Sequence, residues 1–456
     1  MSSRSTGCRL PRLWLLGLLP LATLAAAAGP PGLSELYADA LRDNPGYRAR
    51  AAEARGVRAA LSAAEGRLRP QLALTAASEQ VDERIEGTFY GVVEVDNRDR
   101  FDAHRFGATL SQALFRPELG IEADQARLRA EQAALSLREA EDALLTGLTA
   151  AYFATLAAAD DRLLTQAELA AVARQREQIE GRYAAGLATE ADLQGARARE
   201  ALVEAEGLRT RAQLNTRLAA LRLVVGRPVT RLRRLGAALP LRAPDPPRLE
   251  AWVARARSQN PAVQLRRLGL RLSDQERDKA SQRRLPRLDL VGRGLLLDSG
   301  GGLSGERRET EGRIGLQLQL PLYTGGQLEA GIEAAEAGRE AAAALLAEAE
   351  ADAERDAQVA FLDLEVGRAR LPALQVAVEA ARAAESAVRG GFEAGTRTSA
   401  EVLEAVETRF AAERDLAGAR YRLLLDTLAL KRAAGELLVA DLRALEGLLA
   451  EEAVLP

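Results

Sequence analysis

The sequence is poor in the side chains that carry most protein chemistry. Among its 456 residues there is one cysteine and one histidine, and only two of the 62 basic residues are lysines, Lys279 and Lys431. Aromatic residues make up 4% of the chain, which is little for the core of a globular enzyme. The sequence offers no cysteine or histidine cluster, no glycine-rich phosphate loop and no nucleophile motif. We therefore predict no catalytic residues, no metal site and no cofactor, and assign no role to the lone His104.

A basic surplus and a long apolar run are also missing. The formal net charge is −3, whereas nucleic-acid-binding proteins usually carry a clear excess of basic residues. This balance argues against a nucleic-acid partner. Beyond the N-terminus, no segment offers about 18 uninterrupted apolar residues, the length of a membrane-spanning helix. If the protein crosses a membrane, β-strands must make the crossing.

The N-terminus has the organisation of a secretory signal peptide. It contains three arginines, then an apolar run over residues 13–24, then four alanines at 25–28. A transmembrane anchor is the alternative, but the run is too short to cross a bilayer and Pro20 interrupts it. We predict that residues 1–28 are removed after export. Cys8 leaves with them, so the mature chain has no thiol and no acceptor cysteine for a lipid anchor.

What the sequence has in abundance is alanine, leucine, arginine and glutamate, a composition typical of long packed helices. It also contains an internal repeat. The pair Asn44-Pro45 recurs at 260–261, and Tyr183-Ala-Ala-Gly-Leu187 recurs 209 residues later as Phe392-Glu-Ala-Gly-Thr396. A duplicated unit dictates the architecture. We predict an α+β fold, mainly α, with two structural repeats, each a helix, a β-hairpin and a long α-helical hairpin.

The predicted boundaries follow this repeat. The first repeat covers residues 29–226, with strands at about 70–80 and 101–115 and long helices at about 120–184 and 189–225. A linker rich in proline and arginine covers 227–248. The second repeat covers 249–440, with strands at about 286–297 and 312–322 and long helices at about 327–389 and 399–434. A C-terminal tail follows at 441–456.

The strand prediction rests on alternation of apolar and polar residues. Ile314, Leu316 and Leu318 alternate with glycine and glutamine, which predicts one apolar and one polar face. The polar, glycine-bearing segments 81–100 and 298–311 are predicted as hairpin loops. In a barrel, Asp289 and Arg293 of the third strand would have to point to the lumen. An ordinary antiparallel sheet beside a helical domain fits the same alternation.

The helix prediction rests on uninterrupted length. From Gly120 to Ala184 nothing stops the helical pattern for about 65 residues, or roughly 95 Å at 1.5 Å per residue. Leucines and Tyr152 recur at spacings of seven and four, which keeps one apolar stripe facing a partner helix. In the equivalent helix of the second repeat, Pro372 is expected to introduce a kink.

Two stretches of the sequence resemble the TolC family of channel-tunnels. They are Phe392 to Glu404, followed by Ala419-Arg-Tyr421, and the opening segment Leu33-Ser-Glu-Leu-Tyr37. The resemblance covers nearly the whole mature chain and keeps the order of every element. It implies a homotrimer in the outer membrane of a Gram-negative bacterium, with a 12-stranded β-barrel and a coaxial α-helical barrel across the periplasm. Four strands per chain cannot close a barrel alone, whereas three copies leave no open edge in lipid.

The resemblance also implies a function and partners. The trimer would be the outer-membrane exit duct of a tripartite efflux or type I secretion system, passively conducting small molecules or unfolded proteins. Its partners would be a periplasmic adaptor protein and an inner-membrane ABC or proton-driven transporter. The sequence does not choose among drug, metal and protein cargo. A periplasmic coiled-coil scaffold without a pore is the alternative reading.

The candidate gate lies at the predicted tips of the long helices. Glu401 and Glu404 are three residues apart and share a helix face, so a trimer would form two rings of three carboxylates. A solvated helix face would look the same, but the resembled family has aspartates lining its constriction at these positions. By the same resemblance, Arg397 would hold neighbouring hairpins closed, and Asp192 is the matching acid on the other hairpin. Phe392 stands where the family usually has tyrosine.

Phe392 replaces the family's usual tyrosine, and an alanine at 191 stands where the family can have an assisting threonine. Both departures predict that the latch, meaning the contact by which Arg397 would hold the hairpins closed, is looser here. The turns themselves resemble the tips that periplasmic adaptors contact, which makes Gly186, Leu187, Gly395 and Thr396 candidate contact residues. The glycines have a simpler explanation as well, because a tight helix reversal favours a residue that tolerates positive φ.

Overall fold

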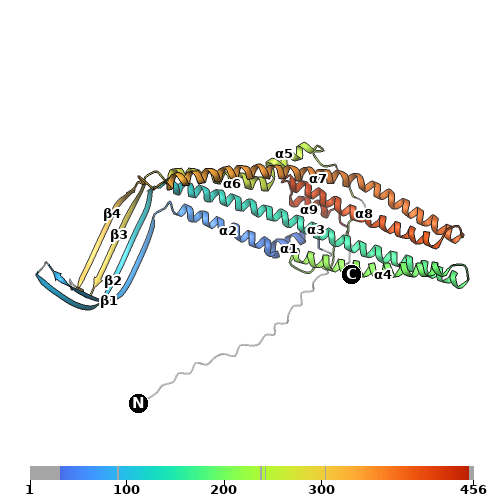
Figure 1. Cartoon of the computed structure of the whole chain (residues 1–456), viewed down its shortest axis with the longest axis horizontal. Helices are drawn as coiled ribbons and strands as arrows, with labels where there is room; N and C mark the ends of the chain where they lie inside the picture. The colour runs from blue at the N-terminus through green and yellow to red at the C-terminus, as the bar shows by residue number, and fades with distance from the viewer. Residues whose placement is uncertain (1–30, 90–91, 237–238, 242, 303–304, 451–456) are drawn as a thin grey trace, which may run out of the picture.

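The computed structural model describes residues 31–89, 92–236, 239–241, 243–302 and 305–450. The predicted signal peptide lies outside these residues, as does the end of the predicted tail. The fold is mainly helical, and long helices run side by side away from a small antiparallel sheet at one end (Figure 1).

Helices and strands follow one another in the same order in both halves of the chain. The first half contains α1 (Leu33–Asp43), α2 (Pro45–Gly66), β1 (Gln71–Phe89), β2 (Val93–Phe115), α3 (Pro117–Ala184) and α4 (Glu190–Val225). The second half contains α5 (Leu249–Gln259), α6 (Pro261–Gln282), β3 (Arg287–Ser299), β4 (Arg307–Gln319), α7 (Gln327–Glu393) and α8 (Ser399–Ala433), and α9 (Val439–Glu446) follows.

The two Asn-Pro pairs found in the sequence have the same structural role. The Asn44 side chain accepts a hydrogen bond from the Tyr47 amide at 3.0 Å and caps α2, while Asn260 accepts one from the Ala262 amide and caps α6. Each asparagine also donates its side-chain amide to a carbonyl near the end of the long returning helix, α4 or α8. The pair therefore fixes where a short helix meets a long one in each half.

The sheet joins the two halves of the chain. Its strand order is β1-β2-β3-β4 with every pair antiparallel, so β2 from the first half pairs with β3 from the second. Within the described residues, β1 and β4 each pair on one side only. The sheet therefore has two open edges.

The predicted hairpin loop at 81–100 was wrong. β1 and β2 stay paired through this segment, where Asp82 on β1 binds Arg98 and Arg100 on β2 at 3.2 and 2.8 Å. This part of the two strands carries polar residues on both faces, so its sequence lacks the apolar–polar alternation that predicts a strand. The second loop is shorter than predicted, because β3 continues to Ser299 and β4 begins at Arg307. β4 ends at Gln319 rather than 322, shortly before Pro321, which has no amide hydrogen for the ladder.

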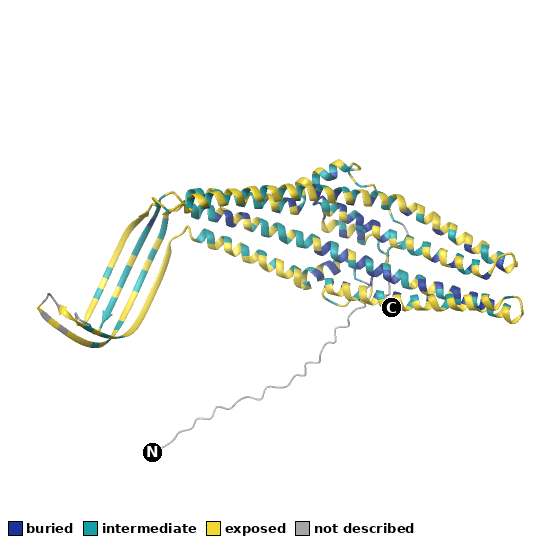
Figure 2. Ribbon diagram, in the orientation of Figure 1, coloured by how far each residue is buried: buried dark blue, intermediate teal, exposed yellow. Residues whose placement is uncertain are grey.

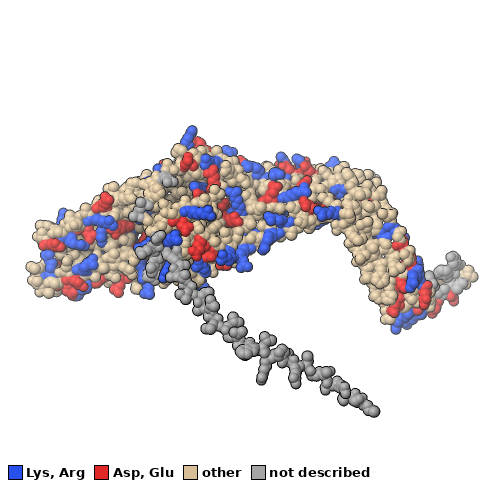
Figure 3. Space-filling model, turned by 180° about the vertical axis from the view of Figure 1, so that it is seen from behind, with Lys and Arg blue, Asp and Glu red and all other residues tan. Residues whose placement is uncertain are grey.

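The register gives the sheet one apolar and one polar face. Residues directly opposite each other point to the same side, and leucine, isoleucine, alanine and glycine line one side across all four strands. Leu74, Ile314 and Leu316 on this side are 65–80% exposed. Asp289 and Arg293 lie on the other side, opposite Gln317 and Thr109 respectively. The part of the sheet nearest the helices is mostly uncharged, whereas charged groups crowd its far end (Figure 3).

The long helices pair as two hairpins, α3 with α4 and α7 with α8, and α3 also packs against α8. Buried residues concentrate halfway along the helices (Figure 2), where Tyr152, Phe153 and Tyr421 lie in the largest apolar cluster. By composition alone, one described helix, α3, has an 18-residue window apolar enough to cross a membrane, but half of that window is buried inside the chain. α7 remains helical through Pro372.

Candidate functional site at the helix tips

Both helical hairpins turn at the end of the molecule farthest from the sheet (Figure 1). α3 ends at Ala184 and α7 ends at Glu393, and each is followed by a turn with a glycine in the left-handed region. Gly186 has φ 74° and Gly395 has φ 78°, a conformation that costs little only for glycine. Open space surrounds the position of a Cβ at either residue. Backbone conformation therefore requires these glycines, and packing does not.

A capping box starts the returning helix of each hairpin. Thr189 caps α4: its hydroxyl and its amide bind the Asp192 carboxylate at 2.6 and 3.0 Å, and it accepts a bond from the Asp192 amide. Thr398 and Glu401 form the same arrangement at the start of α8. Two of the predicted gate acids therefore have a structural task, because they satisfy amides that a helix start leaves unpaired.

Arg397 binds Glu401, and within the chain it does not bind Asp192. Its Nη1 lies 2.7 Å from the Glu401 carboxylate. The side chain lies close against α7, because a Cβ on Gly391 would come within 2.6 Å of the Arg397 Cγ. Asp192 instead accepts a hydrogen bond from the Ser399 hydroxyl at 2.5 Å. The two hairpins thus meet through a serine and an aspartate, a pair that sequence reasoning missed.

These bonds keep the tip acids ionised. Hydrogen bonds from the Thr398 amide, from Arg397 and from the Thr398 hydroxyl lower the pKa of Glu401 to about 2. Hydrogen bonds from Ser399 and Thr189 lower the pKa of Asp192. Both carboxylates therefore carry a full negative charge at neutral pH.

The remaining predicted tip residues lie in three different environments. Glu404 is exposed and has no ion pair within the part of the chain described. Phe392 is buried in a cluster with Ile179 and Leu193, with the Arg182 guanidinium 4.6 Å from its ring centre. Phe392 therefore packs the two hairpins together. Two of the candidate contact residues differ in exposure and bonding: Leu187 is 70% exposed, and the Thr396 hydroxyl donates to the Gly391 carbonyl at 3.1 Å.

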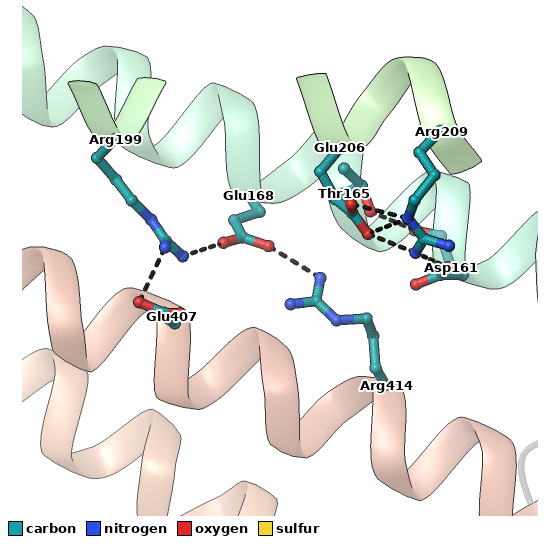
Figure 4. A network of polar contacts seen from close by, with 8 residues as sticks. All are labelled: Asp161, Thr165, Glu168, Arg199, Glu206, Arg209, Glu407 and Arg414. Carbon is teal, nitrogen blue, oxygen red and sulfur yellow. Dashed lines mark hydrogen bonds and ion pairs between the residues drawn. The ribbon is translucent and has the colours of Figure 1, made fainter. Parts of the chain in front are cut away.

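A buried charge network on α3, α4 and α8, away from the tips, was not predicted (Figure 4). The Glu168 carboxylate on α3, 3% exposed, binds Arg199 on α4 and Arg414 on α8, both at 2.8 Å. Arg199 also binds Glu407 on α8 at 2.9 Å. These contacts join three helices from both hairpins. No sequence pattern marks these contacts, because acidic and basic residues are frequent everywhere on these helices.

Known proteins are similar to this chain over most of its length. The family model described as "Outer membrane efflux protein" matches residues 36–227 and 252–436. The outer membrane protein TolC of Vibrio cholerae is 28% identical over 428 residues, which cover 92% of this chain and 94% of that protein. The alkaline protease secretion protein AprF of Pseudomonas aeruginosa is 26% identical over 445 residues, covering 94% of this chain and 89% of the relative.

A solved structure shares the fold. The outer membrane protein VceC from Vibrio cholerae matches with a TM-score of 0.72 at 22% identity, covering 88% of this chain and 96% of that one. The family match itself spans most of both halves of the chain and includes both helical hairpins with their tips. This chain belongs to the outer membrane efflux protein family.

Proposed function

We propose that three copies of this chain close into one duct, with twelve strands forming a barrel in the outer membrane and the helices forming a coaxial tunnel below it. As a member of its family, the chain is an outer-membrane exit duct for efflux or type I secretion. The observation that carries the trimer is the sheet. Its four strands have two open edges and an exposed apolar face, which lipid would tolerate only in a closed barrel.

The two faces of the sheet fit this assignment. The exposed leucines and Ile314 would face lipid, while Asp289, Arg293 and Gln317 would face the lumen. Asp289 already has a partner at the base of the sheet, since Arg116 binds it at 2.5 Å. A pore-free periplasmic scaffold would leave the apolar face in water, where patches of this kind are rare.

The gate of the duct would lie at the helix tips. In a trimer, Glu401 and Glu404 would each form a ring of three carboxylates, and Arg397 would hold the tips closed. Arg397 supports this role because 55% of its side chain is exposed while it binds Glu401, which leaves donors for a neighbouring chain. A guanidinium can bind two carboxylates at once and release one of them.

The same tips would receive the periplasmic adaptor, and through it an inner-membrane ABC or proton-driven pump. Support comes from the exposure of Leu187 and from the open space around Gly186 and Gly395. The names of the relatives do not agree on one cargo, since AprF is named an alkaline protease secretion protein while the family model is named for efflux. We assign the duct no cargo of its own.

The barrel assignment predicts opposite outcomes for two neighbouring residues. Leu316→Arg should prevent recovery of heat-modifiable trimers from the outer membrane, because an arginine facing the middle of the lipid costs about 2–4 kcal/mol at each position. Gln317→Arg, on the other face of the same strand, should leave trimers and pore conductance intact. Equal recovery of both variants, or loss of both, would refute a lipid-facing apolar surface and with it the duct.

A further inference from the structure

Two arginines stand side by side on the polar face of the sheet, the face that also carries Asp289 and Gln317. Arg293 on β3 lies directly opposite Arg313 on β4, and both residues are exposed. The Cβ atoms of directly opposite residues are about 4.5–5.5 Å apart, and like charges at such positions destabilise a sheet. The stability of the sheet therefore does not explain why two arginines face each other here.

The acids near this pair already have partners, and Arg293 has none. Arg293 makes no ion pair within the described part of the chain. The next acid along the polar face is Glu79, six residues beyond Ala73 on β1 and thus about 20 Å further from the helices. The acids that lie closer are each bound by an arginine: Arg313 binds Glu311, Arg307 binds Glu309 at 2.7 Å, and Arg116 binds Asp289 at 2.5 Å.

The surroundings of Arg293 add a further donor and no negative charge. Thr109 on β2 is exposed and lies directly opposite Arg293 on the side away from β4. The next pair toward the helices on this face, Ser111 with Val291, is uncharged. Guanidinium groups bind carboxylates and phosphates with two parallel hydrogen bonds. Two arginines and a hydroxyl on three adjacent strands therefore form a surface suited to an anionic group.

In the proposed barrel, this surface would be repeated around the lumen. Three copies related by a three-fold axis would place six arginines at nearly one level. Side chains fill the interior of an eight-stranded barrel, whereas 16 to 18 strands leave an aqueous channel. In a barrel of twelve strands, the arginines would reach toward a passing solute without closing the passage. The carboxylates of Glu401 and Glu404 lie at the opposite end of the molecule (Figure 1).

We infer that Arg293 and Arg313 form an arginine ring that binds phosphate or carboxylate groups of a passing solute and makes the barrel section of the duct selective for anions. The inference rests on the proposed trimer and adds a chemical class of solute to it. An anionic group in the barrel meets two guanidiniums from each copy, whereas a cation is repelled. The duct thus discriminates by charge in the barrel as well as at its tips.

The reversal potential of single trimers in a planar bilayer measures this selectivity. Between 10 and 100 mM KCl, where the Debye length is about 30 to 10 Å, Arg293→Gln with Arg313→Gln should shift the reversal potential toward cation preference. Arg100→Gln with Arg308→Gln removes two charges from the other face of the sheet and should cause no such shift. The shift should shrink between 0.1 and 1 M KCl, where the Debye length falls to about 3 Å. An equal shift in both double variants, or none in the first, would overturn the ring.

Inorganic tripolyphosphate tests binding in the wild-type trimer. Added to the compartment that faces the barrel, it should block the current. Arg293→Gln with Arg313→Gln should raise the half-blocking concentration by about tenfold, which corresponds to the loss of one charge-assisted hydrogen bond. The double change on the other face should leave that concentration unchanged.

The possible failures are distinguishable. A conducting wild-type trimer that tripolyphosphate does not block from the barrel side would refute the arginine ring and leave the duct intact. A wild-type chain that forms neither trimer nor pore would refute the proposed function itself.

Discussion

Replacing Glu168 with alanine should weaken the helical part of the molecule more than any exposed glutamate does. The substitution removes a carboxylate that is 3% exposed and leaves Arg414 without its ion pair, while Arg199 keeps Glu407 at 2.9 Å. Breaking a buried ion pair by removing one partner costs about 3–5 kcal/mol. The two arginines are 22% and 29% exposed, so water partly compensates them. We therefore expect the lower end, about 3 kcal/mol.

The assay is unfolding in guanidinium chloride, followed by helical circular dichroism of the trimer in detergent. Glu177→Ala is the matched control on the same helix, because its side chain is 69% exposed and 3.8 Å from Arg176. We expect that change to stay below about 0.5 kcal/mol. Combining Glu168→Ala with Arg414→Ala should cost less than the sum of the single changes, since the second removes a charge already stranded. Equal stability of Glu168→Ala and Glu177→Ala would refute the reasoning.

Three further predictions concern the tips. Arg397→Ser should raise single-channel conductance, whereas Arg50→Ser, which removes an exposed ion pair on α2, should not; an unchanged conductance in a folded trimer would argue against the latch. Gly186→Trp should abolish cross-linking to the adaptor, while Gly186→Ala, equally strained but small, should retain it; complexes retained with tryptophan would exclude docking there. Glu401→Gln should lower the melting temperature at pH 6. The pKa of Glu401 is depressed to about 2. Its contribution to the stability of the folded state is therefore complete above the ordinary pKa near 4.5 and is lost as pH falls toward 2. The difference between wild type and Glu401→Gln should vanish there, and a difference that persists would rule out the capping role.

Local chemistry decided which features the sequence could predict. Asn44 and Asn260 cap α2 and α6 through residues two or three positions away, so the recurring Asn-Pro pair carries a local signal for both helix starts. The pattern of threonine followed three residues later by an acid, at 189–192 and 398–401, is the signature of a capping box. Asp192 and Glu401 in these boxes are also the acids that the resemblance assigns to the gate. The local pattern therefore explains both acids without any contact between hairpins.

Long-range contacts could not be predicted in this way. Glu168 and Arg414 are 246 residues apart, and nothing in either local sequence distinguishes them from exposed residues of the same type. The prediction of a loop at 81–100 was wrong for a different reason. The backbone ladder pairs β1 with β2 throughout this segment, and exposed ion pairs such as Asp82 with Arg100 lie across it. A polar strand has no hydrophobic alternation to detect.

The duplication also shows which contacts are free to vary between the two halves. Within the first hairpin, Arg176 binds Glu180 and Glu200; at the positions 209 residues later, Glu385 binds Arg389 and Arg409 with every charge reversed. Inside a hairpin, either sign serves, because both partners come from the same repeat and can change together. A contact between hairpins has no such freedom, since in the proposed ring each helix meets a different neighbour on either side.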